Sequence, residues 1–245
     1  MGWWVDYFDS SKRYGAPKIT ELLKQEGKCI SERLVGEIMS ENGWRSCVSK
    51  KFRVCTTDSN HPFDIAPNTL NQKFHVLEPN SVWVTDITYV PCREGRLYLA
   101  SVMDLYTRKI AGWRLADRMT TDLVLNALEM AYTSHRPAKG LLHHSDRGSQ
   151  YASEAYRQRL ETYGMKASMS RKGNCYDNAC IESWHSLLKK EFIYCTKFKT
   201  KAQAQQKMFE YIELFYNRKR IHGSLGYVSP IRFEENYYKN LKRMA

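Results

Sequence analysis

The chain has 245 residues, of which 42% are hydrophobic and 13% aromatic, so it can bury a core for one large domain and a small additional one. No apolar run is long enough to span a membrane, and we expect no membrane partner. The formal net charge of +12 favours a polyanionic partner, nucleic acid first, although a soluble basic protein without such a partner has the same composition.

The N-terminal stretch and the cysteines bear on the cellular compartment. The first residues lack the basic-then-apolar order of a secretory signal, and no two cysteines form a C-x-x-C pair of a zinc site. We therefore expect a cytoplasmic protein with reduced thiols, most of them small core residues. The cysteines are Cys29, Cys47, Cys55, Cys92, Cys175, Cys180 and Cys195.

Residues 14–45 contain two short helical patterns, APKITELLKQEG and SERLVGEIMSENG. Ser31 is a candidate N-cap for the second helix. The stripes that we expect to be buried are Ile19, Leu22 and Leu23 in the first helix and Leu34, Val35, Ile38 and Met39 in the second. Two helices joined by a tight turn predict a helix-turn-helix-like module, and a plain helical hairpin fits the same pattern.

The chain then divides into three predicted parts: a helical module in residues 1–48, a linker in 49–80 and a catalytic core in 81–245. The linker mixes proline, asparagine and basic residues without a period. Five strand patterns follow: VWVTDITYV, RLYLASVMDL, KIAGWRLA, GLLHHSD and KASMS. Helical patterns separate the later strands and close the chain up to about residue 220. This order predicts an α/β protein with a mixed five-stranded sheet flanked by helices.

Three acids stand out from these elements. Asp86 interrupts an apolar strand, where an unpaired carboxylate is costly, so either a basic partner or a metal ion is expected. Asp146 lies at a predicted strand end, where ligands gather in such sheets. Glu182 lies on a helix for which Asp177 is the expected N-cap, and it shares a face with His185. An exposed helix face with ordinary charges is the alternative for Glu182.

Taken together, the acids predict a site for divalent cations. Two Asp and one Glu supply hard oxygen ligands and no thiolate, which selects Mg²⁺ or Mn²⁺ over zinc. Two such ions about 4 Å apart activate a water or a 3′-hydroxyl and stabilise the leaving oxygen of a phosphoryl displacement. No covalent nucleophile is needed, so neither Ser145 nor Tyr151 is proposed as one.

Three stretches carry a family resemblance: WVTDITYV, HHSDRGSQY and GNCYDNACIESWHSLLKKE. They resemble the catalytic blocks of the integrase core of bacterial transposases, in particular the second-reading-frame product of the insertion-sequence-three family. Asp146 and Glu182 have 35 residues between them, which is the spacing of this family. The module YGAPKITELLKQEG…ISERLVGEIM and the tail FYNRKRIHGSLGYVSP extend the resemblance to residues 12–235.

The resemblance implies an RNase H-like fold and a DDE transposase in which Asp86, Asp146 and Glu182 are the catalytic acids and metal ligands. It also implies that Lys189 contacts transposon-end DNA. Expected partners are DNA, both transposon ends and target, further copies of the chain in a homo-multimer, and an upstream-frame DNA-binding product or fusion. The expected location is the bacterial cytoplasm, in association with the nucleoid. The chain lacks the His/His/Cys/Cys zinc module of retroviral integrases.

Further polar residues near these motifs have alternative functional or structural roles. His143 fits a strand residue with satisfied hydrogen bonds, whereas His144 suits a phosphate contact or the orientation of Asp146. Asp104 is expected to pair with Arg108 or to cap a turn rather than to bind metal. The aromatic stripe of residues 211–216 is expected in the core. The full set of predicted DNA-contacting residues is Lys189, His144, Arg147, Lys172, Asn174, His185 and Arg220.

Three functions are compatible with these residues. The first is metal-dependent DNA cleavage at element ends followed by strand transfer into target DNA. The second is a non-catalytic DNA-binding regulator or an inactive transposase copy. The third is an RNase H-like nuclease without strand transfer. We expect the first, because it alone uses the three acids, the basic charge and the family resemblance together.

Overall fold

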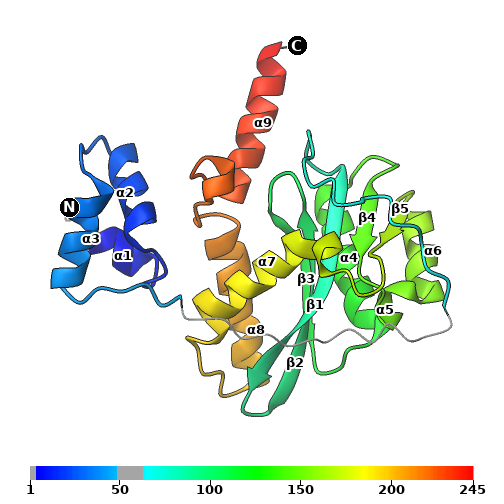
Figure 1. The fold of residues 1–245 in the computed structure, drawn as a ribbon. Helices are drawn as coiled ribbons and strands as arrows, with labels where there is room; N and C mark the ends of the chain where they lie inside the picture. Colours follow the sequence, from blue (N-terminus) through cyan, green and yellow to red (C-terminus); the bar gives the residue numbers. More distant parts are fainter. Residues whose placement is uncertain (1–3, 49–62, 245) are drawn as a thin grey trace.

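A computed structural model describes residues 4–48 and 63–244. Three short helices form the N-terminal module: α1 (Trp4–Asp9), α2 (Ala16–Gln25) and α3 (Glu32–Glu41) (Figure 1). As predicted, Ser31 caps α3, its hydroxyl accepting a hydrogen bond from the Leu34 amide at 3.2 Å. The buried stripe is narrower than predicted, because the Leu34 side chain is exposed while Val35 and Met39 are buried. Helix α1 has no counterpart among the predicted elements.

The core of the protein is the predicted mixed sheet of five strands. Its strands are β1 (Val82–Cys92), β2 (Gly95–Asp104), β3 (Ile110–Ala116), β4 (Leu142–Ser145) and β5 (Lys166–Met169). They are ordered β3-β2-β1-β4-β5. The first three strands form an antiparallel meander, whereas β1 pairs with β4 and β4 with β5 in parallel. The antiparallel part therefore continues into the parallel part through β1.

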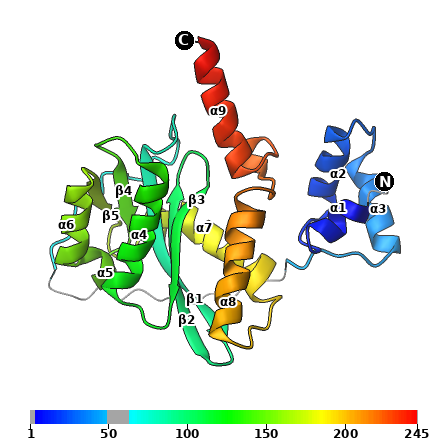
Figure 2. The same cartoon turned by 180° about the vertical axis from the view of Figure 1, so that it is seen from behind.

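Helices cover both faces of this sheet. On one face lie α4 (Thr121–His135), α5 (Ser149–Ala152) and α6 (Glu154–Thr162), as the view from behind shows (Figure 2). On the other face lie α7 (Ala179–Leu188) and α8 (Lys201–Phe209). Each of these two helices continues as a π-helical stretch, Lys189–Ile193 after α7 and Glu210–Tyr216 after α8.

The alternation along β1 decides which way its polar side chain points. Trp83 and Ile87 belong to the core cluster under α4, whereas Val84 and Val90 belong to the cluster under α7 and α8. Since successive strand residues face opposite sides, Asp86 shares the α7 side with Val84. The carboxylate is therefore turned towards the helix that carries Glu182.

The C-terminal part confirms one prediction and adds an element. Tyr211 and Tyr216 are 2% and 1% exposed, so the aromatic stripe belongs to the core as predicted. Helix α9 (Pro230–Met244) was not among the predicted elements. It projects away from the sheet (Figure 1), and Pro230 is its only buried residue among those described.

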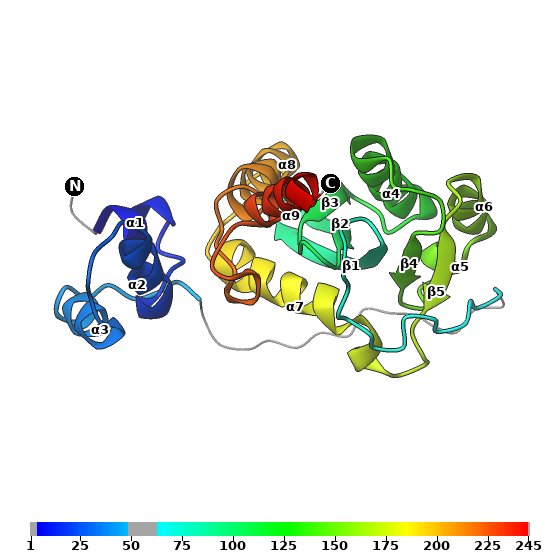
Figure 3. The same ribbon diagram turned by 90° about the horizontal axis from the view of Figure 1, so that it is seen from above.

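The N-terminal module packs beside the ends of α7 and α8, at the opposite end of the molecule from α6 (Figure 3). Arg13 Nε donates a hydrogen bond to the Glu191 carbonyl at 3.1 Å, and the Tyr14 hydroxyl accepts one from the Ile221 amide at 3.1 Å. Ile221 also belongs to the buried cluster of the module. The module therefore packs on the C-terminal part of the chain through both polar and apolar contacts.

Part of the predicted linker, residues 49–62, lies outside the described residues. Residues 63–80 contain no helix or strand. They nevertheless pack on the core, because Leu70 is 2% exposed and belongs to the cluster under α7. Within the described ranges, no helix combines the length and apolar character needed to cross a bilayer.

We predict that Gly112→Ala is strongly destabilising. Gly112 lies on β3 where the strand touches α4, and an added Cβ would lie 2.3 Å from Ala127 O and 2.5 Å from Ala131 N. These are backbone atoms that cannot rotate away, so we expect a loss of about 3 kcal/mol in the free energy of unfolding, measured in urea. Gly36→Ala, inside α3 with 3.8 Å to the nearest atom, is the control and should stabilise by about 0.5–1 kcal/mol. Equal stabilities of the two variants would contradict this account.

Candidate active site

Asp86 and Asp146 lie at the same level of two neighbouring parallel strands. The last register pair of β1 with β4 is Val84 with His144. Two residues further along each strand are Asp86 and Asp146, the latter directly after the end of β4. The two acids therefore occupy equivalent positions along β1 and along the continuation of β4.

Helix α7 lies across this part of β1. At its N-terminus, Asn178 Nδ2 donates a hydrogen bond to the Thr85 carbonyl at 3.1 Å. Nearly two turns later, His185 Nδ1 lies 3.2 Å from Asp86 Oδ2. These two contacts hold the helix against the strand at the position of the first acid.

Glu182 projects from the same face of α7. Lys189 Nζ, just after the helix, lies 4.6 Å from the centre of the Tyr89 ring on β1. Residues 178, 182, 185 and 189 follow one another at helical spacing, so Glu182 lies between the contacts that Asn178 and His185 make with the strand. The side chain of Glu182 is exposed. The third acid is thus on the helix face turned towards Asp86, at the open edge of the site.

Backbone amides orient the two aspartates. Asp86 Oδ1 accepts a hydrogen bond from the Ile87 amide at 2.8 Å. Asp146 Oδ1 accepts one from the Gly148 amide at 2.9 Å. Each bond fixes the orientation of one carboxylate oxygen.

The chemistry of the donor set fits a divalent cation. In the part of the chain that the structure describes, no three His, Cys, Asp or Glu side chains are already close enough together to hold a metal ion. Three residues next to Asp86 or Thr85 nevertheless have a buried polar atom without a hydrogen-bond partner. These atoms are Ser101 Oγ, Asn178 Oδ1 and His185 Nε2. Buried polar atoms normally have partners. The waters carried by a hydrated Mg²⁺ ion could supply such partners.

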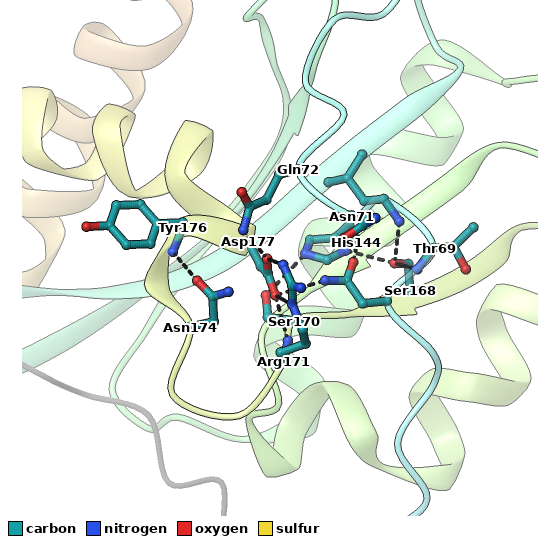
Figure 4. A network of polar contacts seen from close by, with 12 residues as sticks. Thr69, Asn71, Gln72, His144, Ser168, Ser170, Arg171, Asn174, Tyr176 and Asp177 are labelled. Atoms are coloured by element: carbon teal, nitrogen blue, oxygen red, sulfur yellow. Dashed lines mark hydrogen bonds and ion pairs between the residues drawn. The ribbon is translucent and has the colours of Figure 1, made fainter.

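A polar network fixes the loop between β5 and α7 (Figure 4). The Asp177 carboxylate is fully buried. Oδ1 accepts hydrogen bonds from Arg171 Nη2 at 2.7 Å and Gln72 Nε2 at 2.8 Å, and Oδ2 accepts them from Asn68 Nδ2 and from Arg171 Nε and N. The Arg171 guanidinium in particular holds the pKa of this carboxyl well below its usual range. The predicted N-cap role of Asp177 was wrong, since Asn178 precedes the first residue of α7.

His144 belongs to the same region and is fully buried. Its Nδ1 lies 2.9 Å from Ser168 Oγ and its Nε2 lies 3.1 Å from Ser170 Oγ, so both ring nitrogens are used (Figure 4). Burial lowers the pKa of His144 to about 4, which keeps the ring neutral at pH 7. His144 therefore links β4 to the end of β5, and this burial leaves no access for the predicted phosphate contact.

Arg220 also has a different partner from the predicted DNA phosphate. The side chain is 5% exposed, and its Nε and Nη2 each donate to the carboxylate of Glu191 at 2.8 Å. The Tyr211 hydroxyl donates to the same carboxylate at 3.2 Å. Nothing in the spacing of the basic tail motif indicates this pair, because its two members are distant in sequence.

The other predicted DNA-contacting residues differ in how far they are exposed. Arg147 is half-buried, and its Nε donates to the Ser170 carbonyl at 2.6 Å. Lys172 is exposed, and Asn174 Oδ1 accepts a hydrogen bond from the Tyr176 amide at 3.0 Å. Lys189 is half-buried, whereas His185 is buried against Asp86.

Asp104 caps a turn, as predicted. Its Oδ1 accepts hydrogen bonds from the Thr107 amide at 2.7 Å and the Thr107 hydroxyl at 2.8 Å. Its Oδ2 accepts one from the Asn80 amide at 2.6 Å. The buried strand residue His143 is satisfied as well, since its Nε2 lies 3.1 Å from the Tyr156 hydroxyl.

The fold and the sequence match known protein families. Residues 77–175 and 163–230 each match the integrase core domain, and residues 5–52 match an HTH-like domain. A chain of a simian T-cell lymphotropic virus intasome is similar, with a TM-score of 0.55 and 13% identity over 93% of this chain and 73% of that chain. The HTLV-2 integrase catalytic core domain, solved with magnesium, gives a TM-score of 0.50 and 15% identity. This match covers 65% of this chain and 99% of that domain. These likenesses define the predicted class of protein, an integrase core with an RNase H-like fold.

Relatives in bacteria are much closer in sequence. The insertion element IS600 31 kDa protein of Shigella sonnei is 44% identical over 96% of this chain and 86% of its own length. The transposase of IS904 from Lactococcus lactis is 41% identical over 94% of this chain and 90% of its own length. The transposase InsF of IS3A from Escherichia coli K12 is 39% identical over 95% of this chain and 79% of its own length. The chain belongs to the IS3 family of insertion-sequence transposases, which confirms the predicted DDE-type polynucleotidyl transferase.

We predict that Asp177→Asn loosens the loop that leads into α7. The neutral amide turns a donor towards the donors of Arg171 and Asn68, so we expect the free energy of unfolding to fall by about 2 kcal/mol. Amide hydrogen exchange in residues 170–178 should become faster. Asp122→Asn, at an exposed acid in the first turn of α4, is the matched control and should change neither quantity.

The same substitution should also alter the dependence of stability on pH. Because the pKa of the Asp177 carboxyl is depressed in the folded protein, its stabilisation is present above the ordinary value of about 4 and is lost as the pH falls towards the folded pKa. The stability difference between the parent and Asp177→Asn should therefore shrink in acid. A difference that stays constant between neutral and strongly acidic pH would contradict this.

Proposed function

We propose that Asp86, Asp146 and Glu182 form the catalytic centre of this transposase and together bind divalent cations. One observation supports the proposal: Asp86 and Asp146 each lie two residues beyond the last register pair of β1 with β4, and α7, which bears Glu182, contacts β1 through Asn178 and His185. All three ligands are carboxylates, which favours Mg²⁺ or Mn²⁺, and we propose two ions.

The reaction is DNA cleavage at element ends followed by strand transfer. Asp86, Asp146 and Glu182 would hold the ions, which when bound would supply activation of the attacking oxygen and stabilisation of the leaving oxygen. In the first step water attacks a phosphodiester, and the bond to the 3′ oxygen of the element strand breaks. In the second step this 3′-hydroxyl attacks a phosphodiester of the target and displaces a 3′ oxygen there. Neither Tyr151 nor Ser145 is proposed as a covalent nucleophile, since Tyr151 is buried against Thr85 and the Ser145 hydroxyl donates to a backbone carbonyl.

His185 has a positioning role in this proposal. Its Nδ1 contacts Asp86 Oδ2 from one turn beyond Glu182, so it sets the distance between the helix and the first acid. Loss of this contact should leave the Asp86 carboxylate free to rotate. DNA ends would approach from the open side, where Glu182 is exposed.

The proposed contacts with DNA phosphates come from Lys189, Arg147, Lys172 and Asn174. Lys172 and Asn174 lie on the loop from β5 to α7. Arg147 directly follows Asp146, and Lys189 directly follows α7. The net charge of +12 adds a long-range attraction for DNA. Buried His144 and Arg220 are not included in this set.

We propose further that the chain works as a homo-multimer, with an upstream-frame DNA-binding product or fusion as an additional partner. Joining two element ends to one target requires more than one active site, which suits an assembly of several copies. The HTH-like module provides a second DNA-contacting element in each copy.

We predict that Asp86→Asn, Asp146→Asn and Glu182→Gln each lower strand transfer on terminal-repeat DNA by about 100-fold or more. Even groups that only orient metal ligands are worth 10- to 100-fold in activity. The folded state and DNA binding should be retained, because the substitutions preserve shape. Asp122→Asn is the control and should keep parental activity. Activity of Asp146→Asn within a fewfold of the parent would end the assignment.

A metal titration separates catalysis from simple DNA binding. In EDTA we expect DNA binding without cleavage, and addition of Mg²⁺ or Mn²⁺ should produce cleaved and then joined products, resolved on a denaturing gel. Binding in EDTA with no products after addition of Mn²⁺ would favour the non-catalytic regulator. Cleaved products without joined ones would instead favour a nuclease.

A further inference from the structure

Two cysteines that are 148 positions apart meet where the N-terminal module contacts the core. Cys47 follows α3, and Cys195 follows the π-helical stretch after α7. Cys195 Sγ lies 3.5 Å from the Cys47 carbonyl oxygen and 3.4 Å from that of Lys190. Cys47 Sγ lies 3.9 Å from the Glu191 carbonyl oxygen.

Arg13 and residues next to Cys47 make further polar contacts at this place. Arg13 Nε donates to the Glu191 carbonyl at 3.1 Å, and its guanidinium lies 4.3 Å from the centre of the Phe215 ring. Next to Cys47, the Ser46 hydroxyl donates to the Arg13 carbonyl at 2.9 Å, and the Cys47 amide donates to the Lys12 carbonyl at 2.9 Å. The thiols therefore lie at a contact that non-covalent bonds already position.

The two thiols differ in their environment. Cys195 is exposed, whereas Cys47 is half-buried. Burial first, and the Cys195 thiol second, raise the pKa of Cys47 to about 11. A soluble disulfide reagent therefore reaches Cys195 first, and Cys47 is placed to react with the product.

We propose that Cys47 and Cys195 form a reversible disulfide that fastens the HTH-like module to the catalytic core when the protein meets a disulfide oxidant such as glutathione disulfide. The Cys195 thiolate attacks one sulfur of the oxidant, its S–S bond breaks, and one glutathione thiolate leaves. The Cys47 thiolate then attacks the Cys195 sulfur of the mixed disulfide and releases the second glutathione. The two protein thiols lose two electrons and two protons, and glutathione disulfide is reduced to two glutathiones.

The disulfide would restrain the protein by closing a covalent loop between the module and the core. It joins the end of the module to a turn that follows the helix carrying Glu182, across 148 positions. A covalent link at this point prevents the module from leaving the core, while the reduced protein keeps only the non-covalent contacts.

The first test is the chemistry. The folded full chain is incubated with glutathione disulfide, free thiols are blocked with N-ethylmaleimide, and peptides are analysed by mass spectrometry. We expect a linked Cys47–Cys195 peptide that dithiothreitol removes. Cys47→Ser should instead accumulate glutathione on Cys195, and Cys195→Ser should leave Cys47 unmodified. Cys29→Ser, at another exposed thiol, is the control and should form the link like the parent.

The second test asks whether the disulfide restrains the module. Amide hydrogen exchange in α2 and α3 should slow in the oxidised parent and recover after reduction, and oxidant should not change it in Cys195→Ser. A parent that carries only glutathione on Cys195, or that forms only disulfides between molecules, would overturn the proposal. Formation of the link without any change in exchange would overturn its role as a latch.

Discussion

The parallel pairing of β1 with β4 is the constraint on which the rest of the site depends. Among the strands that the structure describes, it joins the antiparallel meander to the parallel half of the sheet. It also sets the level of Asp86 relative to Asp146, which come from strands about 60 positions apart in the chain. A shift of this register by one residue would turn one carboxylate to the opposite face of the sheet. The relative position of the two proposed catalytic aspartates therefore depends on correct assembly of the sheet.

Buried charges connect the sheet to the elements around it. Asp177 ties the loop before α7 to the segment of residues 68–72, and Glu191 with Arg220 ties the end of α7 to the C-terminal tail. Such pairs contribute little net stability, because desolvation offsets much of their attraction, but breaking one leaves an unpaired buried charge. They therefore specify one arrangement of loop, helix and tail rather than simply adding stability. Helix α7 is held at both ends in this way, which supports the placement of Glu182.

The site combines rigid and open parts. Asp86 and Asp146 are oriented by backbone amides, whereas Glu182 is exposed on the helix face above them. This division suits a centre whose last ligand closes when cations and DNA arrive, since three carboxylates without cations repel one another. The positive charge of the chain favours that approach by DNA.

The sequence by itself determined the periodic elements and predicted the three acids as candidate site residues. Alternating and helical patterns located the five strands and the helices α2 and α3, because side-chain periodicity follows directly from backbone geometry. It also indicated Asp104 as a turn cap. Only the tertiary structure decided which polar residues became partners. His144 contacts two serines, and Arg220 pairs with Glu191. Asp177 pairs with Arg171 and does not cap a helix. A histidine or arginine in a basic motif has the same local pattern whether it contacts DNA or a buried carboxylate. Its partner is chosen by contacts between distant segments, which no local periodicity encodes.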